Sequence, residues 1–148
     1  MSKAMASNST PNTSPTNLSK MEYYNIKALA IMRLCIGASC IFIPGPVFAL
    51  CGYPLRTIEL STFARMIGAR DLILGDLLYT AEDKTAADGG KREMRRALWG
   101  GMAADLFDAG VVVAAVSGGY LRKGPGSFFI GGVMVAVGQA VWGLKALR

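Results

Sequence analysis

Four apolar runs follow one another along the chain, and polar or glycine- and proline-rich segments separate them. They are approximately Tyr23–Ile43, Ser61–Ala81, Ala97–Val116 and Phe128–Leu147. Each run has about 20 residues, the length that a helix needs to cross a ~30 Å hydrocarbon core. The last run has no charged residue from Phe128 to Leu144, whereas a helix of a soluble protein normally has a polar face. The pattern predicts an all-α fold, a four-helix transmembrane bundle.

The segments between these runs predict the domain organisation. Residues 1–22 are rich in Ser, Thr, Asn and Pro, which predicts a disordered polar tail, and residues 23–148 then form the four-span membrane domain. Pro44-Gly45-Pro46 predicts the end of the first helix and a loop after it, because proline cannot continue a helix. Residues 82–96 are expected to form a charged connector.

Composition and charge add an expected orientation. The chain is 52% hydrophobic and has a net charge of +6. Ten of its Lys and Arg residues lie on the side of the tail, the 82–96 connector and the C-terminus, and three lie in the other two loops. Basic loops face the cytosol, so both termini are expected there, in a multi-pass protein of the endoplasmic reticulum. Topology explains the basic charge, and no nucleic-acid partner is expected.

The absence of histidine limits the chemistry. It removes the commonest general base and the usual ligand of haem, zinc and copper. No nucleotide-binding motif is present either. The sequence therefore predicts neither a cofactor nor a metal.

Charged residues inside the apolar runs are the main functional signal. They are Arg33 in the first run, Arg65, Arg70, Asp71 and Asp76 in the second, and Asp105 and Asp108 in the third. Each charge at the bilayer centre costs about 2.5–3.5 kcal/mol, so these side chains need partners. Counting residues along each span predicts one buried cluster of Arg70, Asp71, Asp105 and Asp108. Arg33 and Asp76 are expected to form a second, shallower pair.

Two interpretations of these charges remain open. In the first, they line a pocket in which Asp71, Asp105 and Asp108 are catalytic and Arg33, Arg65, Arg70 and Asp76 bind the substrate. In the second, they are ion pairs that fix how the helices pack. Small residues and aspartates share faces at helical spacing, as Ala64, Gly68, Asp71 and Gly75 do, which places the aspartates on packing faces and fits both interpretations.

Two motifs carry a resemblance to a known family. The segment F-A-R-M-I-G-A-R-D-L-I-L-G runs from Phe63 to Gly75, and D-x-x-D-A-G follows one span later, from Asp105 to Gly110. Together they resemble a family of small fungal four-helix integral membrane proteins that is classified as a domain of unknown function. The resemblance implies a setting among fungal genes of secondary-metabolite biosynthesis.

The leading functional hypothesis is an accessory or tailoring factor that acts on a lipophilic small molecule between the spans. As an enzyme it would be a cofactor-free isomerase, cyclase or proton-transfer catalyst, with aspartate as acid or base and arginine stabilising an anion. The alternative is a non-catalytic membrane scaffold or assembly factor whose buried charges fix helix packing. The expected partners are the lipid bilayer, the small molecule, and a membrane protein or a second copy of the chain.

Overall fold

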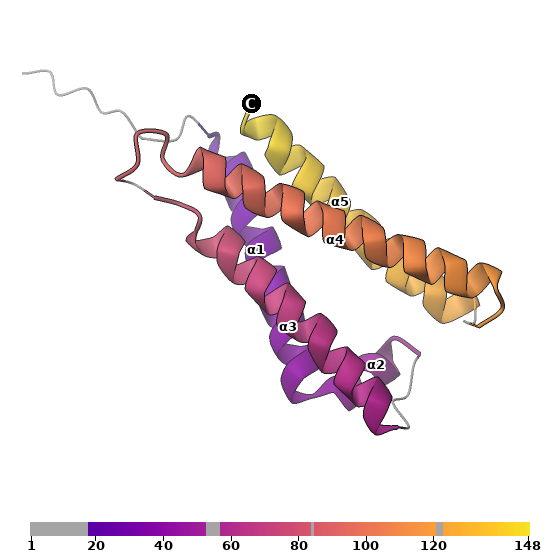
Figure 1. The fold of residues 1–148 in the computed structure, drawn as a ribbon. Helices are drawn as coiled ribbons and strands as arrows, with labels where there is room; N and C mark the ends of the chain where they lie inside the picture. The colour runs from indigo at the N-terminus through magenta and orange to yellow at the C-terminus, as the bar shows by residue number, and fades with distance from the viewer. Residues whose placement is uncertain (1–17, 53–56, 84, 121–122) are drawn as a thin grey trace, which may run out of the picture.

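The computed structural model describes residues 18–52, 57–83, 85–120 and 123–148, and every regular element in them is an α-helix. The helices are α1 (Lys20–Phe42), α2 (Pro44–Leu50), α3 (Ile58–Thr80), α4 (Lys91–Ser117) and α5 (Lys123–Ala146) (Figure 1). The all-α prediction is confirmed. Most of the predicted tail, residues 1–17, lies outside the described residues.

The first helix begins earlier than the hydrophobic pattern predicted. The Ser19 hydroxyl accepts a hydrogen bond from the Glu22 backbone N–H at 3.3 Å, and the Glu22 carboxylate accepts one from the Ser19 N–H at 2.8 Å. This capping box satisfies two N–H groups that a helix start otherwise leaves free. Residues 20–22, assigned to the tail from the sequence, are therefore the first turn of α1.

Two connectors differ from their prediction. Pro44 does end α1, but the predicted loop begins with the short helix α2, since proline is well tolerated at the first position of a new helix. The charged connector is also shorter than expected, because its residues from Lys91 onward already belong to α4. With these residues α4 comprises 27 residues. At about 1.5 Å per residue, the helix is about 40 Å long.

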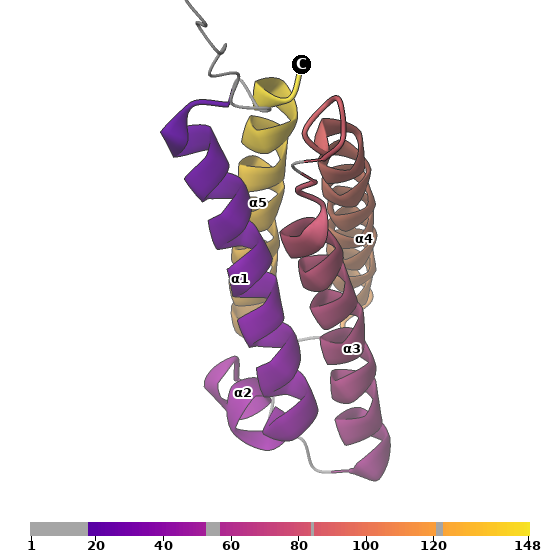
Figure 2. The same ribbon diagram turned by 90° about the vertical axis from the view of Figure 1, so that its left-hand side faces the viewer.

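The helices form two antiparallel pairs, α1 with α3 and α4 with α5 (Figures 1 and 2). Glycines bring the first pair into backbone contact. A Cβ atom on Gly68 would lie 2.7 Å from the Gly37 carbonyl oxygen, and one on Gly75 would lie 2.9 Å from the Leu34 nitrogen. Only the absence of side chains at these points allows the two backbones to lie so close.

The two pairs pack together at one end of the molecule. The buried core takes residues from the first half of α1, the last turn of α3, the first half of α4 and the second half of α5; examples are Leu29, Leu78, Leu98 and Ala140. Figure 1 shows the pairs close together where α1 begins and α5 ends, and separated toward α2. The two pairs therefore diverge along α1 in the direction of α2.

Among the described residues, three helices are long and apolar enough to cross a membrane: α1, α4 and residues 129–146 of α5. They indicate a membrane protein. Four such helices were predicted, and α3 does not qualify by its own composition. It has 23 residues and is therefore long enough, but it carries Glu59, Arg65, Arg70, Asp71 and Asp76, too many charges for an apolar span.

Candidate functional site

Five charged side chains form one continuous network across three helices. Arg33 of α1 forms ion pairs with Asp71 of α3, at 3.4 Å, and with Asp105 of α4. Arg70 of α3 forms ion pairs with Asp71, at 2.9 Å, and with Asp108 of α4, at 2.5 Å. The order along the network is Asp105, Arg33, Asp71, Arg70, Asp108, so that each arginine bridges two aspartates.

The network is most buried at its Arg33 end. Arg33 and Asp105 are each only 5% exposed, whereas the Arg70 side chain is 31% exposed. Charge-assisted hydrogen bonds are the strongest that side chains make, and here they replace the water that burial removes. Three carboxylates face two guanidinium groups, so the network carries one net negative charge when every group is ionised.

Small residues make room for the most buried arginine. A Cβ atom on Gly101 would lie 3.2 Å from Arg33 Nη2. A larger residue at position 101 would therefore contact the guanidinium that reaches Asp105 one helical turn further along α4. The glycine contacts between α1 and α3 similarly bring Arg33 near Asp71.

The structure brings together the four residues predicted to cluster, and it adds Arg33 to them. The predicted pair of Arg33 and Asp76 is not formed. Because α1 begins at Lys20, Arg33 lies about 20 Å along the axis from the helix start. Asp76 lies in the last turn or so of α3, only about 6 Å from the helix end, so the two side chains are at different levels.

The two remaining predicted site residues lie apart from the network. Arg65 and Asp76 are both exposed, and neither has an ion-pair partner within the part of the chain that the structure describes. Arg65 precedes Arg70 and lies toward the start of α3. The expected substrate-binding set therefore divides into Arg33 and Arg70 inside the network and Arg65 and Asp76 outside it.

A groove of about 320 Å³ opens beside the buried end of the network. Its polar floor is Arg33, Asp71 and Asp105, and its apolar walls are Met32, Ile36, Phe129, Gly132, Val133, Val135 and Ala136. The α5 wall was not assigned to the site from the sequence. Its only signal is the small residues Gly132 and Ala136 at a spacing of four, which also fits plain helix packing.

A second polar cluster lies where α1 begins and α3 ends. Lys27 forms an ion pair with Glu82 at 3.3 Å, and its ammonium group donates a hydrogen bond to the Tyr79 carbonyl oxygen at 2.8 Å. The Tyr23 hydroxyl donates to the same Glu82 carboxylate at 3.1 Å, and Lys27 also lies over the Tyr79 ring. This cluster fastens the two helix ends to each other.

Among the described residues, no group of three or more cysteine, aspartate or glutamate side chains is placed to hold a metal ion. The chemistry that the groove offers on its own is that of hydrogen bonding, charge and proton transfer. Comparisons with protein-family models, curated proteins and solved structures find no match to this chain.

Proposed function

We propose that this membrane protein holds one lipophilic small molecule in the groove between its two helix pairs. The observation that supports this is the groove's combination of an apolar wall with a charged, fully bonded floor. Ligand sites are typically apolar cavities of ~300–1,000 Å³ with a few polar groups that orient the ligand. At about 320 Å³ the groove suits a small ligand.

We place α3 in the bilayer beside the three apolar helices. Contacts of Gly68 with Gly37 and of Gly75 with Ala30 and Leu34 run along much of both helices, so α3 lies at the depth of α1. Its two central charges, Arg70 and Asp71, are neutralised within the network. In this arrangement α3 is the fourth membrane helix. Its contacts with the neighbouring helices stabilise it in the bilayer, because its own hydropathy is too low to do so.

The orientation proposed is the one with basic ends in the cytosol, in the endoplasmic reticulum membrane. The beginning of α1, the beginning of α4 and the C-terminus lie at one end of the molecule (Figure 1). Attachment of sugar to the acceptor patterns at Asn8, Asn12 or Asn17 in cells would contradict this orientation.

The charged residues on the floor of the groove determine which polar group of the ligand can bind there. Asp71 and Asp105 supply two carboxylates against the single guanidinium of Arg33. A ligand with a hydroxyl or amine that donates hydrogen bonds fits this floor better than a carboxylate does. A carboxylate oxygen of the site could also take a proton from a bound carbon acid and return it elsewhere, which is the proton transfer of a cofactor-free isomerase or cyclase.

In this proposal the protein is an accessory or tailoring factor, and the resemblance of its two motifs suggests fungal secondary-metabolite biosynthesis as its setting. A deletion strain tests the biological part. Accumulation of a lipophilic intermediate is expected, and an unchanged metabolite profile with loss of a partner membrane protein would contradict it.

A matched pair of glycine variants tests the groove itself. Gly132 lines it and Gly131 does not, and a Cβ atom on either would meet nothing within 4 Å. Gly132→Leu is expected to fill the groove and abolish co-purification of a small molecule detected by mass spectrometry of the extracted protein. Gly131→Leu is expected to leave it unchanged. Equal occupancy in both variants would overturn the proposal, and a released acyl chain would identify the occupant as membrane lipid.

A second function, a non-catalytic scaffold, is favoured by a different observation. All five network side chains are bonded to one another, and they join α4 to the α1–α3 pair. A scaffold predicts that paired neutralisation, Arg33→Gln with Asp105→Asn, preserves function in cells. A ligand site predicts that the same variant is made and inserted but inactive.

A further inference from the structure

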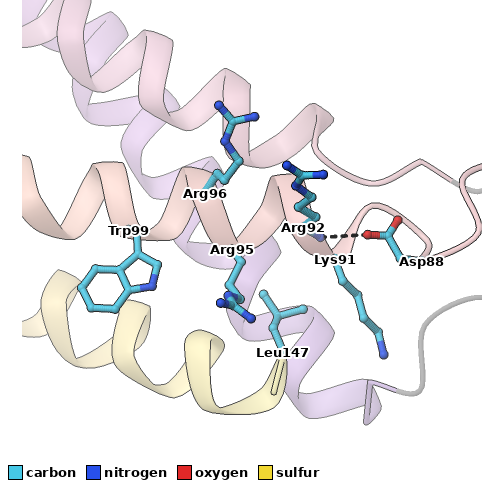
Figure 3. A pocket seen from close by; sticks show the side chains of 7 residues that line it. All are labelled: Asp88, Lys91, Arg92, Arg95, Arg96, Trp99 and Leu147. Carbon is cyan, nitrogen blue, oxygen red and sulfur yellow. Dashed lines mark hydrogen bonds between the residues drawn. The ribbon is translucent and has the colours of Figure 1, made fainter.

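A second cavity, of about 680 Å³, lies where α4 begins and α5 ends. Its lining is shown in Figure 3 and consists of Asp88, Lys91, Arg92, Arg95, Arg96, Trp99 and Leu147. A smaller cavity of about 140 Å³ adjoins it and shares Arg95 and Trp99 with it. Arg148 lines this smaller cavity and adds a fifth cation.

The cations of this basic cavity are largely uncompensated. Of the five, Arg96 alone has an ion pair among the described residues, a 3.4 Å contact with Glu93 in which both side chains are mostly exposed. The Asp88 carboxylate is engaged by backbone N–H groups, of Gly90 at 3.1 Å and of Arg92 at 3.2 Å (Figure 3). Like charges one helical turn apart repel each other, so a bound anion would stabilise this arrangement.

The side chains divide the cavity into a cationic and an apolar part. Figure 3 shows Lys91, Arg95 and Trp99 on the side of α4 that faces the end of α5, where Leu147 lies. Trp99 is 56% exposed. A large indole left open beside two cations offers an apolar surface next to a site for negative charge, which is the pattern of an amphipathic ligand.

The length of α4 sets the depth of the cavity in a membrane. A helix of about 40 Å exceeds a ~30 Å hydrocarbon core by about 10 Å, which is roughly six or seven residues. The charged segment Lys91–Arg96 accounts for this excess, and the apolar part of the helix starts at Ala97. The cations therefore lie at the level of the lipid phosphates, with Trp99 at the interface, where tryptophan is enriched.

We infer that this basic cavity binds the phosphate group of an anionic phospholipid. Lys91 and Arg95 contact the phosphate, and Trp99 and Leu147 contact the glycerol and the start of the acyl chains. The inference rests on the proposed placement of α4 in a membrane. It does not depend on the ligand proposed for the groove, because the groove lies near the middle of the helices.

Quenching of tryptophan fluorescence by brominated lipids tests the inference. The full chain carrying Trp142→Phe, with Trp99 as the only tryptophan, is reconstituted in phosphatidylcholine bilayers. A minority of brominated phosphatidic acid or brominated phosphatidylcholine is then added. We expect stronger quenching by the anionic lipid, and a fall of about fivefold in this preference for each cation removed by Lys91→Gln or Arg95→Gln.

The matched control removes two charges at the same end of the molecule without touching either cavity. Lys20→Gln with Lys145→Gln is expected to keep the preference, whereas Lys91→Gln with Arg95→Gln loses it. Equal losses in both double variants would show a general surface potential and overturn the inference. Displacement of brominated phosphatidic acid by millimolar inorganic phosphate would identify free phosphate, not lipid, as the ligand and overturn it as well. If Trp142→Phe does not fold, lipid adducts of the otherwise native chain in native mass spectrometry provide the same comparison.

Discussion

Arg33 and Asp105 form the most buried ion pair of the protein among the described residues, and they connect the first helix to the fourth. The same arginine contacts Asp71 of α3, so one guanidinium joins three helices. A buried arginine with two carboxylate partners is satisfied only when all three helices are in place. This contact therefore couples the packing of the two helix pairs to the shape of the groove between them.

Removing one member of this contact is expected to be costly. Arg33→Gln leaves Asp105 without a cation, and breaking a buried pair in this way costs roughly 3–5 kcal/mol. Adding Asp105→Asn removes the uncompensated charge, so the double variant should be more stable than Arg33→Gln alone. Unfolding of the detergent-solubilised protein by sodium dodecyl sulfate, followed by circular dichroism, measures the coupling.

The exposed Arg65 supplies the control for this cycle. Arg65→Gln removes the same charge from the neighbouring α3, at a position without an ion-pair partner among the described residues. A change in the free energy of unfolding of at most about 0.5 kcal/mol is expected there. Strictly additive effects of Arg33→Gln and Asp105→Asn would show that the pair contributes nothing to stability.

Alanine substitution of two glycines is expected to change stability in opposite directions, because one lies in the close contact between α1 and α3 and the other does not. A methyl group at Gly68 would lie 2.7 Å from the Gly37 carbonyl oxygen and 2.8 Å from Cys40 Cβ, so Gly68→Ala must push the helices apart. Overpacking of this kind costs about 1–3 kcal/mol. At Gly100 nothing lies within 4 Å of an added Cβ atom. Gly100→Ala should therefore stabilise α4 by roughly 0.5–1 kcal/mol. Melting temperatures of the two variants that shift in the same direction would contradict this account of the packing.

Much of the helical architecture could be predicted from the sequence, because apolar runs of ~20 residues leave few alternatives to a helix in a membrane. The helix starts were less accurate. Lys91–Arg96 is too polar to extend an apolar run, yet it forms the first turns of α4. The starts of α1 and α2 depend on local signals, the Ser19–Glu22 capping box and Pro44, which hydrophobicity does not record.

The charge cluster could be predicted in part for a related reason. Four of its members lie near the middle of their helices whichever residue is taken as the helix start. Arg33 was assigned too shallow a depth: even from Tyr23, the start of the apolar run, it lies about 15 Å along the helix, which is level with the cluster and deeper than Asp76. The groove could not be predicted, since it depends on the separation of the two helix pairs, and separation is a property of three-dimensional packing that no single segment encodes.

The cluster at the ends of α1 and α3 predicts a salt-dependent contribution to stability. Lys27 and Glu82 are 3.3 Å apart, with side chains 18% and 22% exposed. Glu82→Gln is expected to lower stability by roughly 0.5–1 kcal/mol at low salt, after allowance for solvent screening, and by less in high salt. Glu93→Gln removes the exposed pair with Arg96 and should have no measurable effect. Thermal melts at two salt concentrations compare the variants, and equal losses for both would contradict the importance of the partly buried pair.

The stability of the turn after α3 is expected to depend on pH, because the Thr85 side chain lowers the pKa of Asp83. The Asp83 carboxylate accepts hydrogen bonds from the Thr85 hydroxyl at 2.6 Å and from the Thr85 backbone N–H at 2.8 Å. These bonds favour the charged form and hold the pKa of Asp83 below its ordinary value of 3.8. Because the pKa is lower in the folded turn, the stabilisation is fully present above pH 3.8 and is lost as the pH falls through the lowered pKa.

Thr85→Ala removes the hydroxyl and keeps the N–H, so the pKa of Asp83 should rise part of the way toward 3.8. Thr80→Ala, a nearby threonine whose hydroxyl bonds to the Asp76 carbonyl oxygen instead, should leave it unchanged. Carbon-13 resonances of the Asp83 carboxyl group, titrated in micelles, give the three pKa values, and an identical value in all three proteins would show that the Thr85 hydroxyl does not set it.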